Sequence, residues 1–164
     1  MEQKLRRNQN ALVILGAGVI AFGFWSGIKT ILVYFLQTDK MNEIAAELGE
    51  GVGNIPPMLL LWIIVSVILG IDLLLRLYVG LSARAEGFGR KRGRAYLVVA
   101  ALMIVFFAAA IIFSITSFSL DNYDSILDAV VTFAVDLTSM ITLIELFVAA
   151  IRVKKLTRAL EKEG

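Results

Sequence analysis

The sequence predicts an all-α integral membrane protein, a bundle of four transmembrane helices that forms one membrane domain over residues 1–164. Composition is the first reason, because 59% of the residues are hydrophobic, 18% are charged and the mean hydropathy is +0.81. A soluble domain needs far less apolar sequence for its core. The second reason is that the apolar residues fall into long runs, and about 20 such residues cross a hydrocarbon core.

Each span has its own character. The first follows a short basic segment and continues through aromatic and branched residues, which is typical of an uncleaved signal anchor. The second opens at Pro57, a helical position where a missing N–H costs little. The third contains no ionisable side chain, whereas the fourth is rich in acids and hydroxyls. The spans are expected at about residues 11–36, 57–81, 95–117 and 125–152.

The connecting segments differ in charge, and this difference predicts the topology. Three basic residues precede the first span, five lie in the loop at 82–94 and five lie between Arg152 and the end of the tail at 153–164. The outer segments carry only Lys40. By the positive-inside rule both termini are cytoplasmic, in the cell (inner or plasma) membrane of a bacterial type of cell. The basic face is also expected to attract anionic lipid headgroups.

The first outer segment, residues 37–55, is predicted to be amphipathic. Its apolar residues Met41, Ile44, Ala45 and Leu48 recur at helical spacing, so a short helix on the bundle or on the membrane surface is expected. The second outer segment is a short acidic turn at 119–125.

The two halves of the chain align weakly. Ile71-Asp72-Leu73 matches Ile144-Glu145-Leu146, and a basic pair introduces the first span of each half. Each half holds two spans, so the alignment predicts a parallel repeat of two helical hairpins, related by an axis along the membrane normal. The positive-inside rule alone would also produce the basic matches.

Charged side chains within the spans are the candidate functional residues, because such groups are costly in a bilayer and face protein, water or an ion. Asp136, Glu145 and Asp72 are the candidate ion- or substrate-binding acids. Arg76 is a candidate counterion because it follows Asp72 by one turn, the favourable order for an intrahelical pair. Lys29 is the second candidate counterion, with Asp136 or Asp128 as its partner. Asp128 otherwise caps its own helix from the first turn, after Ser125.

The polar residues of the fourth span form a stripe that faces either the bundle interior or a partner subunit. A glycine pair in the first span, Gly23 and Gly27, allows close helix packing, either within the chain or in a homo-oligomer.

Three classes of function are consistent with this pattern. The first is a proton- or cation-coupled transporter or channel that uses the intramembrane carboxylates. The alternative is a non-catalytic membrane scaffold or accessory subunit whose buried charges set helix packing and partner choice. An intramembrane enzyme is disfavoured, because the chain has no cysteine or histidine and no asparagine- and aspartate-containing signal peptidase motif around Asp72. The same absences argue against metal sites and cofactors, and no nucleic-acid partner is expected.

Overall fold

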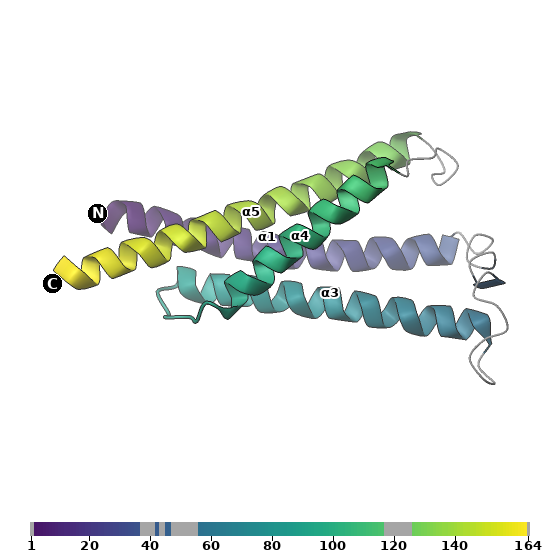
Figure 1. The fold of residues 1–164 in the computed structure, drawn as a ribbon, viewed down its shortest axis with the longest axis horizontal. Helices are drawn as coiled ribbons and strands as arrows, with labels where there is room; N and C mark the ends of the chain where they lie inside the picture. The colour runs from purple at the N-terminus through teal and green to yellow at the C-terminus, as the bar shows by residue number, and fades with distance from the viewer. Residues whose placement is uncertain (1, 37–41, 43–44, 47–55, 117–125, 164) are drawn as a thin grey trace. The chain divides into compact units, whose positions relative to one another are not determined.

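The chain is all-helical in the part that the structure, a computed structural model, describes: residues 2–36, 42, 45, 46, 56–116 and 126–163. It contains the long helices α1 (Glu2–Leu36), α3 (Pro57–Gly87), α4 (Ala95–Thr116) and α5 (Ile126–Glu163) (Figure 1). All four are long and apolar enough to cross a membrane, so the prediction of four apolar helices is confirmed. The acidic turn expected at 119–125 lies outside the described residues, as does most of the amphipathic segment expected at 37–55.

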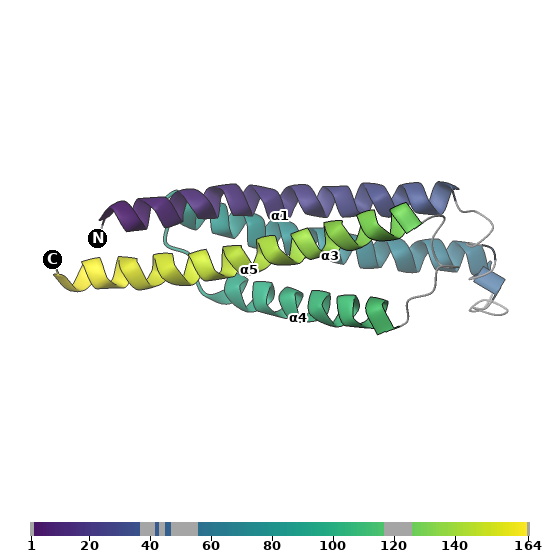
Figure 2. The same ribbon diagram turned by 90° about the horizontal axis from the view of Figure 1, so that it is seen from above.

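The helices contribute to two compact units. The larger unit comprises Met1–Ile20 and Tyr78–Gly164, and the smaller comprises Ala21–Leu77. In the larger unit, α4 packs beside α5, as Figure 1 and Figure 2 show from two directions. Its core takes side chains from all four helices, and the largest fully buried ones are Tyr96, Leu12, Leu143, Leu146, Val19 and Val79.

Glycines bring α1 and α3 into backbone contact within the larger unit. A Cβ added at Gly16 would lie 2.7 Å from the carbonyl oxygen of Gly80, and one added at Gly80 would lie 2.6 Å from that of Gly16. Two turns further along α3, a Cβ added at Gly87 would lie 2.7 Å from the carbonyl oxygen of Gln9 in α1. Larger residues would force the helices apart, so the glycines set the packing of this pair.

The end of α3 differs from the loop that the sequence predicts over 82–94. The helix continues to Gly87, because Ala83, Ala85 and Glu86 are good helix formers. Two backbone hydrogen bonds cap its last carbonyl groups. The N–H of Gly89 donates to the carbonyl oxygen of Glu86 at 2.9 Å, and the N–H of Arg90 donates to that of Ala85 at 3.0 Å. These two bonds form a Schellman motif, which requires the left-handed φ of 82° that Gly89 adopts. Only residues 88–94 are left to connect α3 to α4.

The smaller unit pairs the second half of α1 with the first half of α3. Gly23 lies against α3, since a Cβ there would be 2.7 Å from Cδ of Arg76, whereas a Cβ at Gly27 would meet nothing within 4 Å. Gly23 therefore serves packing within the chain, one of the two roles expected for it. Near the start of α3, Leu61 is buried together with Ala45.

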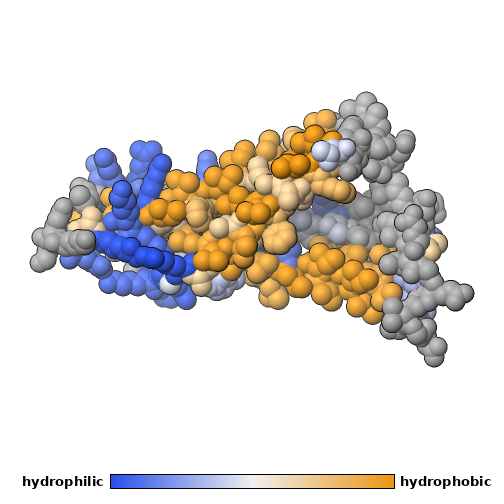
Figure 3. Space-filling view, in the orientation of Figure 1, coloured by the Kyte–Doolittle hydropathy of each residue, from blue (hydrophilic) through white to orange (hydrophobic). Residues whose placement is uncertain are grey.

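Polar and apolar surfaces separate along the larger unit. The first turns of α1, the 88–94 connection and the last turns of α5 lie at one end, which we call the basic end (Figure 1). Hydrophilic residues gather there, and hydrophobic surface covers α4 and α5 beyond it (Figure 3). Phe106 of α4 is 73% exposed and Val105 is 65% exposed, values that suit a helix facing lipid rather than water.

Candidate functional site

Asp72 and Arg76 form the expected intrahelical ion pair in the smaller unit. Nε of Arg76 donates a 2.8 Å hydrogen bond to Oδ2 of Asp72. The Arg76 side chain is 3% exposed and that of Asp72 is 31% exposed. Gly23 makes room for the arginine stem, whose Cδ lies 2.7 Å from the place of a glycine Cβ. The pair neutralises its own charges, which is what an apolar environment requires.

Asp72 also borders a shallow groove within the smaller unit. The groove has a volume of about 220 Å³, and Asp72 is the only charged residue among those that line it in the described part of the chain. The rest of the lining is apolar side chains and the glycines Gly23, Gly27 and Gly70. Lys29, on the same stretch of α1, is half-buried. Lys29 and Asp136 belong to different units, so their ion pair stays a prediction.

The acids of α5 lie at the surface of the larger unit. Asp136 and Glu145 are both exposed, whereas Ser139 of the same polar stripe is buried. Thr142 is half-buried and packs near Gly18 of α1. The side chain of Asp128 lies outside the described residues. The polar stripe therefore runs along the border between the core and the surface of the unit.

Glu145 lines a long cleft between α1 and α5, which we call the α1–α5 cleft. Its volume is about 960 Å³. Glu145 is about 10 Å along α5 from Arg152, given a rise of 1.5 Å per residue. The wall near Glu145 is apolar, and the wall near the basic end carries Lys4, Arg7, Arg152 and Lys155. Among the described residues, Glu145 makes no ion pair and no side-chain hydrogen bond.

A buried polar cluster joins α3, α4 and α5 at the basic end. We call Glu86, Tyr96 and Lys154 the Glu86 cluster. The Tyr96 hydroxyl donates a 2.6 Å hydrogen bond to Oε2 of Glu86, and Nζ of Lys154 lies 2.9 Å from the same oxygen. The Lys154 ammonium is also 5.4 Å from the centre of the Tyr96 ring, within cation–π range. The Glu86 side chain is 6% exposed, so its carboxylate is held almost entirely by these partners.

Lys154 also fastens the connection between α3 and α4. Its Nζ donates a 2.9 Å hydrogen bond to the carbonyl oxygen of Arg92. A second link, exposed to solvent, is the 2.6 Å ion pair between Lys91 and Glu161. The hydrogen bond to Glu161 raises the pKa of the Lys91 ammonium above its ordinary value. The 88–94 connection is therefore tied to α5 at two points.

The Glu86 cluster was not predicted from the sequence. Glu86 falls within the loop predicted over 82–94, and no pattern in the sequence singles out Tyr96 or Lys154. One feature of the sequence could have indicated the longer helix. Gly80 and Gly87 are spaced for close packing of a helix, and Gly89 is suited to cap its end. Extending the helix to Gly87 would have placed Glu86 one turn beyond Ser82, on the buried side of α3.

The described residues hold no group of three His, Cys, Asp or Glu side chains that could bind a metal ion. No protein-family model, curated protein or solved structure matches this chain.

Proposed function

We propose that this protein is a non-catalytic membrane scaffold or accessory subunit, and that the face of α5 around Glu145 contacts another membrane protein. The observation that carries the proposal is the exposure of Glu145 on an apolar helix without a partner among the described residues. A carboxylate facing lipid costs on the order of 2.5 to 3.5 kcal/mol. A partner helix with a cationic or hydrogen-bond-donating side chain would remove that cost.

The other carboxylates support the same proposal by contrast. Asp72 is paired with Arg76, and Glu86 is paired with Lys154. Both pairs form within the chain, so neither carboxylate needs a ligand, and the Glu86–Lys154 pair also links α3 to α5. Glu145 lacks such a counterion, and an external partner is the simplest source of one.

The orientation belongs to this proposal. The three basic segments meet at the basic end of the larger unit, and we propose that this end is cytoplasmic, in accordance with the positive-inside rule. Single cysteines at Glu47 and Arg90 test it, because they should be labelled from opposite sides of the membrane. Labelling of both from the outside would contradict the orientation.

A second candidate function is a proton- or cation-coupled transporter or channel. The observation that favours it is the α1–α5 cleft, which connects Glu145 with the basic end. If water fills this cleft, Glu145 can exchange protons with that side of the membrane. Transport would further require a path from Glu145 or Asp136 to the opposite side.

Site-specific photo-crosslinking in native membranes tests the scaffold proposal. A photoreactive residue at Val148, which is 38% exposed and lines the α1–α5 cleft, should give protein adducts. The same residue at Val105 of α4 should give lipid adducts and is the matched control. Glu145→Leu should lower the Val148 adduct yield more than Glu145→Gln, because glutamine still forms hydrogen bonds. Lipid adducts alone at Val148, or equal yields in both variants, would contradict the proposal.

A further inference from the structure

A second cleft at the basic end, the α4–α5 cleft, brings basic side chains together from two parts of the chain. It has a volume of about 500 Å³, which is within the range of small-ligand sites. Among the described residues that line it, four are basic and none is acidic. They are Arg94, the last residue before α4, and Lys154, Lys155 and Arg158 of α5.

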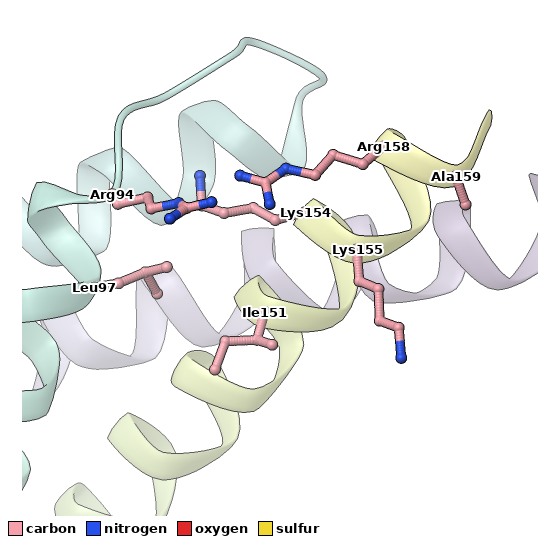
Figure 4. A pocket seen from close by; sticks show the side chains of 7 residues that line it. All are labelled: Arg94, Leu97, Ile151, Lys154, Lys155, Arg158 and Ala159. Atoms are coloured by element: carbon pink, nitrogen blue, oxygen red, sulfur yellow. The ribbon is translucent and has the colours of Figure 1, made fainter. Parts of the chain in front are cut away.

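The two arginines of this cleft point toward one another. In Figure 4 the guanidinium groups of Arg94 and Arg158 extend from opposite sides, with the end of Lys154 between them, while Lys155 extends away. The Lys154 charge is already balanced by Glu86 at 2.9 Å. In the part of the chain that the structure describes, Arg94 and Arg158 form no direct ion pair; the acid that interacts with Arg158 electrostatically is Glu161, which is itself paired with Lys91. Two like charges held in this way favour an anion between them.

The chemistry of the side chains points to a phosphate group. Guanidinium groups bind phosphate oxygens through paired N–H donors, and two of them can hold one phosphate from both sides. No carboxylate is among the described residues that line the cleft, and the charge of nearby Glu86 is balanced by the lining residue Lys154.

The position of the cleft points to a lipid as the source of the phosphate. Leu97 and Ile151 line the same cleft, so apolar surface begins directly beside the arginines. The α4 surface then continues with Val98 and Leu102, which are 60% and 54% exposed, within a stretch apolar enough to cross a membrane. A phospholipid places its phosphate and its acyl chains in this order along the membrane normal.

We propose that the α4–α5 cleft is a binding site for an anionic glycerophospholipid, whose phosphate is held between Arg94 and Arg158 and whose acyl chains lie along α4. The site is independent of the proposed contact at Glu145. A failure of either proposal leaves the other standing.

Native mass spectrometry of the purified full-length protein in mild detergent, titrated with phosphatidylglycerol, tests the site. The double substitution Arg94→Gln with Arg158→Gln should weaken binding at least about 30-fold, since losing the direct hydrogen bonds of each guanidinium to the phosphate costs at least about 1 kcal/mol, or about fivefold. The double substitution Arg6→Gln with Arg90→Gln removes the same charge from exposed positions outside this cleft and should bind like the wild type.

Several results would overturn the proposal. One is an equal loss in both double variants, which would mean general attraction to the basic end. Another is binding of phosphatidylcholine as tightly as phosphatidylglycerol. Displacement of the lipid by millimolar inorganic phosphate would assign the site to a soluble anion instead. If the double variant has a lowered thermal midpoint, the single Arg158→Gln variant, altered at one exposed position on α5, must still show a specific loss.

Discussion

Replacing Lys154 by methionine should destabilise the larger unit by about 3 kcal/mol. Breaking a buried ion pair from one side costs about 3 to 5 kcal/mol, because the other charge is left uncompensated. The lower end of this energy range applies here, because the Lys154 side chain is 17% exposed and water reaches part of the ion pair. The 2.9 Å bond to the carbonyl oxygen of Arg92 is lost as well, which adds to the effect.

A thermodynamic cycle separates the pair from its surroundings. Glu86→Gln keeps an oxygen that accepts from Tyr96 and removes the charge, so it should cost about 1 to 2 kcal/mol. Adding Glu86→Gln to Lys154→Met should cost at least about 1 kcal/mol less than the sum of the single effects.

Thermal unfolding followed by circular dichroism in mild detergent measures this cycle. For a chain of this size, about 3 kcal/mol corresponds to a midpoint lower by about 6 to 12 °C. A Lys154→Met midpoint equal to that of the wild type would refute the reasoning. If the stability losses of the two single variants add up to that of the double variant, Glu86 and Lys154 are solvated separately.

Two further predictions use the same assay. Arg76→Ala should lower stability by about 2 kcal/mol, because it leaves the partly buried Asp72 carboxylate without its ion pair, and a further Asp72→Ala should restore part of the loss; an unchanged single variant would rule out this role. Gly16→Ala should cost about 1 to 3 kcal/mol through overpacking, whereas the control Gly27→Ala, in open space on the same helix, should be neutral or slightly stabilising. Equal effects of the two alanines would argue against backbone contact between α1 and α3.

Features that depend on local sequence could be predicted. The four apolar helices follow from length and hydropathy, which need no knowledge of neighbours. The Asp72–Arg76 pair follows from the spacing of one helical turn. The parallel repeat of two hairpins, by contrast, rests on weak matches between the halves and stays a prediction.

Features that depend on contacts between distant segments could not be predicted from the sequence. The Glu86 cluster joins residues that are 10 and more than 60 positions apart, and no periodic pattern links them. The surface position of Glu145 depends on how α5 is rotated in the core, and Leu143 and Leu146 fix that rotation. A polar stripe alone does not say whether its acids face the interior or the surface.

The most direct test of the scaffold proposal is ion flux through purified protein in liposomes, measured for protons and for candidate cations. The proposal predicts no coupled flux in the wild type or in Asp136→Asn, in which asparagine keeps the shape of the side chain without its charge. Flux in the wild type that Asp136→Asn abolishes and Glu145→Gln reduces, with the fold intact, would contradict it and establish the transporter instead.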